Sequence, residues 1–240
     1  MIKNYIRFSI LSLIFVSACT ISNAQSNQKS ILNSLKSKAI PIASFKQSDI
    51  GNPSIAGTAK VSENGFDITA GGADIWGVKD EFYFVYIERT GDFDLVSRIE
   101  SFSAADLYTK AGLMAREDLT AGCRHVYFQV FPDNSPRNKN NGGYEFQYRQ
   151  VKDSLMKAIY PKSFTGIPEF PVAFPNTWIR LQRNKNVFTG YYGIDGKSWT
   201  PYTTFTLELP SKIYLGLAVT SHNVNRSAAA KFRNIEELIH

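Results

Sequence analysis

Three strand-like segments of the sequence carry the side chains best suited to chemistry. In residues 110–116, 125–131 and 144–149, polar and apolar residues alternate. Because successive side chains of a β-strand point to opposite faces, each segment presents its small or apolar residues to one side and its polar residues to the other. The polar set should therefore share the open face of a sheet. Together with Tyr192 of segment 187–194, the predicted face comprises Lys110, Arg116, His125, Tyr127, Gln129, Glu145, Gln147 and Arg149.

This face combines planar aromatic rings with bidentate hydrogen-bonding groups, which is what sugar rings and their hydroxyl or acidic substituents require. The pattern predicts a groove that binds carbohydrate. The alternative is an ordinary solvated face, since one side of an antiparallel sheet is commonly polar without any function. On that interpretation His125 is a structural histidine, and Arg116 and Arg149 pair with Glu117 or Glu145 as surface ions that contribute little.

The elements that must position these side chains are short strands joined by tight turns. Turn residues such as Glu63-Asn64-Gly65, Thr90-Gly91-Asp92 and Asp195-Gly196 separate runs of β-branched and aromatic residues. About eleven strands with hardly any helix predict an all-β fold, a jelly-roll sandwich of two antiparallel sheets. The predicted strands are residues 57–62, 65–70, 82–86, 93–102, 110–116, 125–131, 144–149, 178–183, 187–194, 203–207 and 213–220.

Short motifs follow one another along the chain in a specific order. They are Asp49-Ile50-Gly51, residues 73–77, 80–82, 91–93, Arg98, and residues 110–116, 146–149, 178–183, 195–199 and 216–222. From about residue 49 to its end, the chain resembles the concanavalin A-like (laminin-G-like) sandwich family of unknown function that includes the fungal "regulation of enolase" proteins. The resemblance implies a concanavalin A-like sandwich whose concave sheet carries the polar face. It implies little about function beyond frequent association with carbohydrate-active modules.

The resemblance also raises the question of a metal. Laminin-G-like sandwiches sometimes hold Ca²⁺ at the rim, and Asp49, Asp74 and Asp80 offer oxygen ligands. No compact calcium-loop spacing is present, and aspartates at turns also serve as local acceptors for backbone N–H groups. We expect no cofactor and no metal, with Ca²⁺ as the alternative.

Catalysis is the enzymatic alternative to binding. Retaining glycosidases on this fold carry a Glu-x-Asp-x-x-Glu strand, and the sequence contains no such pattern. A glycosidase or polysaccharide lyase built on His125, Glu145 and Tyr192 stays open, and it would show a second acid across the groove from Glu145. Ser221-His222-Asn223 has residue types of a catalytic triad, but no Gly-x-Ser-x-Gly elbow accompanies it. We assign no catalytic residue.

Two further features lie outside the predicted face. Trp76, Trp178 and Trp199 are interpreted as core or turn anchors rather than exposed stacking platforms. Residues 150–176 form a long proline-containing segment of a kind that is often functional. An interaction protein, the third possibility, would show an exposed apolar patch on this segment instead of a polar groove.

The first residues have the composition of an export signal. Lys3 and Arg7 precede an apolar run over residues 8–16 that is too short to span a bilayer as a stable anchor. The run ends in Val16-Ser17-Ala18-Cys19, which resembles the bacterial lipobox, whose cysteine is lipidated and becomes the mature N-terminus. We therefore expect lipidation of Cys19.

The residues after Cys19 bear on the destination of the protein. Thr20 is not the aspartate that retains lipoproteins at an inner membrane, so we expect an outer-membrane lipoprotein. The alternative is cleavage after Ala24, which gives a periplasmic or secreted protein. The predicted organisation is a lipoprotein-type signal peptide over residues 1–19, a polar tether over residues 20–41 and a concanavalin A-like sandwich domain over residues 42–240.

Net charge restricts the partners. The formal charge is +6, and removing Lys3 and Arg7 with the signal peptide lowers it to about +4. No Lys/Arg-rich block accompanies this excess, so we expect no nucleic-acid partner. We expect a monomer that touches the membrane only through its lipid and binds polysaccharide without catalysis. A mildly basic groove would suit an acidic or sulfated glycan.

Overall fold

The computed structural model describes residues 36–134, 143–160 and 171–240, and it confirms the predicted all-β jelly-roll sandwich. The predicted signal peptide, the lipidation site Cys19 and residues 20–35 of the predicted tether lie outside the described residues. Strands dominate the described part, which contains one turn of 3-10 helix, η1 (Ile42–Ser44). No helix in these ranges is long and apolar enough to cross a membrane.

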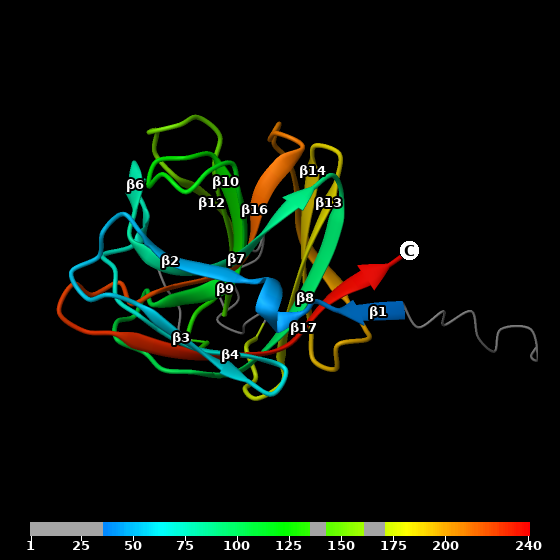
Figure 1. Cartoon of the computed structure of the whole chain (residues 1–240), viewed down its shortest axis with the longest axis horizontal. Helices are drawn as coiled ribbons and strands as arrows, with labels where there is room; N and C mark the ends of the chain where they lie inside the picture. Colours follow the sequence, from blue (N-terminus) through cyan, green and yellow to red (C-terminus); the bar gives the residue numbers. More distant parts are fainter. Residues whose placement is uncertain (1–35, 135–142, 161–170) are drawn as a thin grey trace, which may run out of the picture. The chain divides into compact units, whose positions relative to one another are not determined.

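Two large antiparallel sheets face each other (Figure 1). The first sheet has the order β15 (Thr200–Thr206), β14 (Val187–Gly193), β13 (Thr177–Asn184), β8 (Phe93–Phe102), β17 (Ala228–Ile239), β4 (Gly65–Ala70) and β3 (Thr58–Ser62), with β1 (Lys36–Ala39) paired to β17. The second has the order β12 (Lys157–Ile159), β11 (Tyr144–Arg149), β10 (His125–Val130), β9 (Lys110–Arg116), β16 (Lys212–Thr220), β7 (Phe82–Thr90) and β2 (Lys46–Ile50). A separate hairpin consists of β5 (Ile75–Trp76) and β6 (Lys79–Asp80).

The main core fills the space between the two sheets. On β10, Val126, Phe128 and Val130 are fully buried there, and Phe146 of β11 packs beside Phe128. Each buried side chain of this size stabilises the fold by about 1.5–3 kcal/mol relative to its exposed state. The alternation predicted for residues 110–116, 125–131 and 144–149 is therefore correct: their apolar sides form the core.

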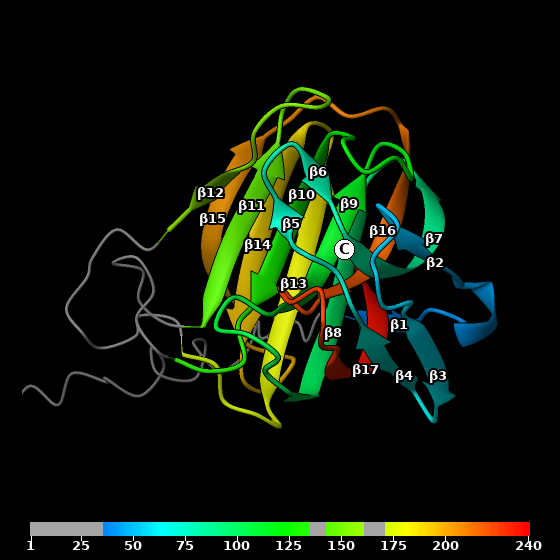
Figure 2. The same ribbon diagram turned by 90° about the vertical axis from the view of Figure 1, so that its left-hand side faces the viewer.

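The opposite face of the seven-stranded sheet, called here the outer face, carries a second apolar cluster. Phe82 and Phe84 of β7 and Met114 of β9 lie on this face, and Ile75 of the hairpin and Met156 cover them. Figure 2 shows the β5–β6 hairpin in front of this sheet. Much of the face that the sequence predicted to be open is thus covered by chain segments that do not belong to the sheet.

Several strands differ from the prediction. β17 is the longest strand among the described residues but is absent from the predicted set, because the sequence AAAKFRNIEELI is rich in residues that favour helix. The alternation of buried and exposed residues along β17 also shifts at an irregularity between Arg233 and Glu236, so the sequence shows no continuous period of two residues there. The sandwich also begins before the predicted residue 42. β1 pairs along the end of β17, so residues 36–39 of the predicted tether belong to a sheet.

Candidate functional site

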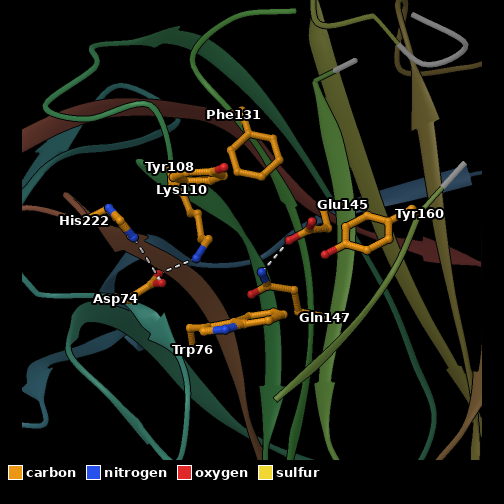
Figure 3. A pocket seen from close by; sticks show the side chains of 9 residues that line it. All are labelled: Asp74, Trp76, Tyr108, Lys110, Phe131, Glu145, Gln147, Tyr160 and His222. Carbon is orange, nitrogen blue, oxygen red and sulfur yellow. Dashed lines mark hydrogen bonds and ion pairs between the residues drawn. The ribbon is translucent and has the colours of Figure 1, made fainter. Parts of the chain in front are cut away.

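A pocket opens on the outer face beside the covered region (Figure 3). It has a volume of about 220 Å³. β9 and β11 supply its polar floor. Trp76 of the hairpin and residues of the segments that precede β5 and β9 and follow β10, β12 and β16 supply the rest. The lining residues are Asp74, Trp76, Tyr108, Lys110, Phe131, Glu145, Gln147, Tyr160 and His222.

Hydrogen bonds hold the turn that carries Asp74 against the end of β16. The carbonyl oxygen of Gly72 accepts hydrogen bonds from Thr220 Oγ1 at 3.3 Å and Ser221 Oγ at 3.1 Å. Gly72 has a φ of 115°, which favours glycine. His222 has a φ of 56°, which is uncommon for a residue with a side chain and is found preferentially at functional sites. This arrangement brings Asp74 and His222 to one wall although they are far apart in the sequence.

Opposite charges alternate along that wall. The Asp74 carboxylate forms an ion pair with Lys110 through Oδ1, and its Oδ2 lies 3.3 Å from His222 Nε2. His222 Nδ1 lies 2.9 Å from Asp106 Oδ1. Burial pushes the pKa of Asp74 upward, but the charge of Lys110 and the hydrogen bond from His222 outweigh it and lower this pKa. The hydrogen bond to Asp74 raises the pKa of His222. With His222 protonated, two cations and two carboxylates balance one another.

Glu145 and Gln147 lie across the pocket from Asp74 and His222 (Figure 3). Glu145 Oε1 accepts hydrogen bonds from Gln129 Nε2 at 3.0 Å and from Gln147 Nε2. Burial raises the pKa of Glu145 to about 7, so this carboxyl changes its charge near neutral pH. Gln147 Oε1 is buried and has no hydrogen-bond donor among the described residues.

Aromatic rings form the remaining walls. Lys110 Nζ lies 5.8 Å from the ring centroid of Trp76, and the ring of Tyr108 packs 5.3 Å from that of His222 and 6.4 Å from that of Phe131. Trp76 is 38% exposed and Tyr160 is 43% exposed. Trp76 thus stands at a turn, as expected, but its ring is an exposed pocket wall rather than a buried anchor.

The structure places the predicted ligand-binding residues in three groups. Lys110, Glu145 and Gln147 line the pocket. Gln129 lies beneath it as the buried partner of Glu145, and Tyr127 is fully buried, with its hydroxyl donating to a main-chain carbonyl at 3.0 Å. Neither of these two side chains lines the pocket.

The second group, Arg116, His125 and Arg149, is fully buried around Asp80 of the hairpin. Arg149 Nη1 and Nη2 donate to the two carboxylate oxygens of Asp80 at 2.8 and 2.7 Å. Arg116 Nη2 and His125 Nδ1 lie 3.9 and 3.7 Å from Asp80 Oδ2. Burial lowers the pKa of His125 to about 4. These side chains bind the hairpin to the sheet, so they are neither pocket residues nor the weak surface ion pairs that the sequence allowed.

Tyr192 forms the third group, because β14 belongs to the other sheet. Its ring centroid lies 5.5 Å from that of Tyr144, and it packs against the main core. His125 and Gln129 are four residues apart on β10, and Gln129 pairs with Glu145. His125 and Glu145 are therefore separated by roughly 13 Å along the sheet. The structure does not bring His125, Glu145 and Tyr192 together as one site.

Sequence reasoning missed most of the pocket wall. Asp74 and Trp76 lie in a conspicuous turn and His222 in a triad-like tripeptide. The sequence predicts Asp74 as a turn acceptor or calcium ligand and Trp76 as an anchor, and it gives His222 no role. Tyr108 and Tyr160 attracted no assignment. The available signal was positional: Tyr108, Phe131 and His222 lie within two residues of the ends of β9, β10 and β16, which are neighbouring strands.

The three candidate calcium ligands have other partners. Asp49 Oδ1 accepts a hydrogen bond from the Gly57 N–H at 2.9 Å, while Asp74 pairs with Lys110 and Asp80 with Arg149. Across the described ranges, no group of three or more His, Cys, Asp or Glu residues is arranged to hold a metal ion.

Two antiparallel sheets in jelly-roll order, with a polar, aromatic-walled pocket on one sheet, define a concanavalin A-like sandwich.

No protein-family model and no curated protein matches the chain. Solved structures do match, and their likeness concerns the fold. A functionally unknown protein from Saccharomyces cerevisiae aligns with a TM-score of 0.62 at 12% identity, over 84% of this chain and 99% of its own. The carbohydrate-binding module CBM66 from Bacillus subtilis aligns with a TM-score of 0.50 at 15% identity, over 82% and 96%. A GH43 protein, BlXynB from Bacillus licheniformis, aligns with a TM-score of 0.52 at 11% identity, over 73% and 33%.

Proposed function

We propose that this protein binds carbohydrate non-catalytically in the pocket on the outer face. The observation that carries the proposal is the combination of fixed polar groups with exposed rings. Lys110 and Glu145 are held by neighbouring side chains, whereas Trp76 and Tyr160 expose their rings at the same opening. Fixed donors and acceptors select hydroxyl positions, and ring faces stack on the apolar surface of a sugar.

The size of the pocket favours one sugar residue. A volume of about 220 Å³ is below the roughly 300–1,000 Å³ that is typical of sites for drug-sized ligands. The covered region beside the pocket also interrupts the continuous groove that a long polysaccharide would need. We therefore infer recognition of a terminal or single residue. Similarity of fold to the carbohydrate-binding module CBM66 is compatible with this function but does not specify a ligand.

A glycan array probed with the purified protein tests the proposal. Trp76→Ala removes an exposed ring without touching the main core. We expect binding to weaken about tenfold, because the apolar face of the sugar loses the ring surface against which it is buried. Trp199→Ala is the matched control, because Trp199 directly precedes β15 of the other sheet and does not line the pocket, and this variant should bind like the wild type. Equal binding by the Trp76 variant would contradict the assignment of the pocket.

A second candidate function, glycoside hydrolysis, is favoured by one specific observation. Asp74 is a second acid across the pocket from Glu145, and the two environments shift their pKa values in opposite directions. Such a pair is typical of an acid and an ionised carboxylate in catalysis. We rank binding first because Asp74 already accepts hydrogen bonds or ion pairs from the Ile75 N–H, Lys110 and His222.

Product analysis separates the two functions. Each saccharide bound on the array is incubated with the protein and analysed by chromatography. We expect no cleavage. Cleavage that disappears in both Glu145→Gln and Asp74→Asn would replace the binding proposal by a hydrolase.

We further propose that Cys19 is lipidated and that the protein is a monomeric outer-membrane lipoprotein of the sandwich family resembled by its motifs. The lipobox-like segment ending at Cys19 and the nature of Thr20 support this address. Metabolic labelling with palmitate tests it: wild-type protein should incorporate label and fractionate with outer membrane. The Cys19→Ala variant should do neither. If the wild-type protein incorporates no palmitate, cleavage after Ala24 is supported instead.

A further inference from the structure

We propose that His222, when protonated, holds Asp74 and Asp106 together as one wall of the pocket and that this bridge controls the affinity for the ligand, with Asp106 as a positioning residue. These three side chains are called here the histidine bridge. The inference rests on the proposed carbohydrate-binding function. It goes beyond that function because it gives the site a regulatory proton and a residue that acts through His222.

Three segments that are distant in the sequence meet at the bridge. Asp74 comes from the turn before β5, Tyr108 from the loop before β9 and His222 from the segment after β16, and all three line the pocket. Thr109 Oγ1 of that loop lies 2.8 Å from the Ser221 carbonyl oxygen, and the hydrogen bonds described above hold the turn against the end of β16. These contacts do not involve the imidazole ring, so we expect variants of the bridge to fold.

The ring of His222 lies between the two carboxylates. Its Nε2 is 3.3 Å from Asp74 Oδ2, and its Nδ1 is 2.9 Å from Asp106 Oδ1. The main chain also holds both carboxylates, because the Ile75 N–H donates to Asp74 at 2.7 Å and the Tyr108 N–H donates to Asp106 at 2.8 Å. A neutral imidazole has one N–H and turns a lone pair toward its second neighbour, whereas the protonated ring donates from both nitrogens. The complete bridge therefore needs the proton.

The groups around the ring determine the pH range of the bridge. Among the described residues, the titratable groups that face it are Asp74 from the turn, Asp106 and Tyr108 from the loop, and Lys110 from β9. The hydrogen bond to Asp74 raises the pKa of His222 above 6.5, and Asp106 raises it further, against the effects of burial and Lys110. The bridge is thus complete below pH 6.5 and is lost as pH rises through this higher pKa.

Loss of the proton should weaken ligand binding. A neutral ring leaves one carboxylate of the bridge without its donor, and the ligand must then fix side chains that were held before. Fixing one mobile side chain weakens binding roughly two- to tenfold. We expect affinity about tenfold lower at pH 9 than at pH 6. Because linkage is reciprocal, a bound ligand should raise the pKa of His222 by about one unit.

Nuclear magnetic resonance and calorimetry on the purified protein test both expectations. The chain contains three histidines, so the ring signals of His222 are assigned by their loss in His222→Asn. Asparagine tolerates the positive φ of this position. The ring is titrated with and without the methyl glycosides of glucose, galactose and mannose and the strongest-binding saccharide of the array. Calorimetry measures the affinity for the same saccharides from pH 6 to pH 9.

Asp106→Asn distinguishes regulation from a structural role, since Asp106 does not line the pocket. The amide oxygen can still accept the Tyr108 N–H, but the negative charge is lost. We expect a lower pKa for His222 and a decrease in affinity that begins at lower pH by the same interval. A merely structural effect would weaken binding equally at every pH. Glu145 titrates near pH 7 in all these proteins, so the difference between wild type and variant is the diagnostic quantity.

Two further variants complete the comparison. His222→Asn should bind at pH 6 about as weakly as the wild type does at pH 9, because the bridge is absent at both values. His240→Asn is the matched control, since it removes a histidine that contacts Asp94 on the other sheet. It should keep the pH dependence of the wild type.

The outcomes separate the inference from the proposed function. If saccharide binds but leaves the pKa of His222 unchanged or lowers it, the inference is overturned and the binding function stands. Identical pH profiles of affinity for the wild type and folded Asp106→Asn would also overturn it. If no saccharide binds on the array or in the calorimeter at any pH, the proposed function fails and the inference fails with it.

Discussion

Two titratable residues of the seven-stranded sheet are buried with pKa shifts that oppose each other in their effect on stability. Burial lowers the pKa of His125 to about 4, so the folded protein keeps this ring neutral at a pH where the unfolded chain protonates it. Burial raises the pKa of Glu145 to about 7, so the folded protein keeps a proton that the unfolded chain has released. The sequence places both residues on one polar face, but one serves the fold and the other lines the pocket.

The signs of the two contributions follow from proton linkage. The contribution of His125 is present above pH 6.5 and is lost as pH falls toward 4. The contribution of Glu145 is present below pH 4.5 and is lost as pH rises toward 7. Between pH 4.5 and 6.5, His125 makes the free energy of unfolding rise with pH and Glu145 makes it fall. We therefore expect the two groups together to change this free energy little in the wild type.

Glu145→Gln should expose the slope of His125. We expect the free energy of unfolding of this variant to fall by roughly 2–3 kcal/mol, relative to the wild type, as pH decreases from 6.5 to 4.5. Urea denaturation at several pH values measures it. His125→Asn should show the opposite slope, since Glu145 then acts alone. Parallel pH profiles for all three proteins would contradict the assigned protonation states.

At the scale of elements, the β5–β6 hairpin determines which part of the sheet is open. Ile75 packs into the second apolar cluster, and Asp80 forms a fully buried, bidentate ion pair with Arg149. The same short hairpin carries Trp76 into the pocket, next to Asp74. Hairpin docking and pocket geometry are therefore linked through one buried ion pair.

Asp80→Asn tests this link. Removing the carboxylate leaves the buried charge of Arg149 with main-chain carbonyl partners but no anion, and we expect a loss of about 3–5 kcal/mol in the free energy of unfolding. We also expect faster amide hydrogen exchange in residues 75–80 and weaker ligand binding, because Trp76 loses its fixed position.

Asp94→Asn is the matched control for that experiment. Asp94 makes a similar buried, bidentate pair with Arg180, both bonds being 2.6 Å, but on the other sheet. Its variant should be destabilised without faster exchange in the hairpin and without loss of affinity. Equal effects of both variants on the hairpin would mean that general destabilisation, rather than docking, controls the pocket.

At the scale of the whole molecule, the sandwich includes residues before the predicted domain start. β1 extends the eight-stranded sheet along the end of β17, and the Ile40 N–H donates to the Ile235 carbonyl at 3.1 Å. All four residues of β1 are exposed, so pairing adds hydrogen bonds but little apolar burial. We therefore expect β1 to contribute modestly to stability.

Truncation measures that contribution. A chain that begins at residue 42 should unfold with a free energy about 1–2 kcal/mol lower than a chain that begins at residue 36, because several net backbone hydrogen bonds and the contacts of Ile40 are lost. Both chains should bind the same ligand, since β1 and the pocket belong to different sheets. Identical denaturation midpoints for the two chains would mean that β1 does not stabilise the domain and that residue 42 is a sufficient start.

The sequence predicted the sheets more completely than it predicted the site. Alternation in residues 110–116, 125–131 and 144–149 assigned every one of their side chains to the correct side of the sheet. It did not reveal that Arg116 and Arg149 would be buried, because the carboxylate that both surround belongs to the β5–β6 hairpin, which is distant from them in the sequence. β17 escaped prediction because local propensity favoured helix, and only pairing with β4 and β8 makes it a strand.

By itself, then, the sequence determined the fold class, the strands of strong alternation and the side of the sheet that bears polar groups, because a period of two residues is a local property. The tertiary structure decided which polar side chains meet a ligand. The turns that carry Asp74, Trp76 and His222 are positioned by long-range hydrogen bonds. Arg149 binds Asp80 of the hairpin, which lies 69 residues earlier in the chain. A period along one strand carries no information about such partners, since their approach is set by the packing of separate elements.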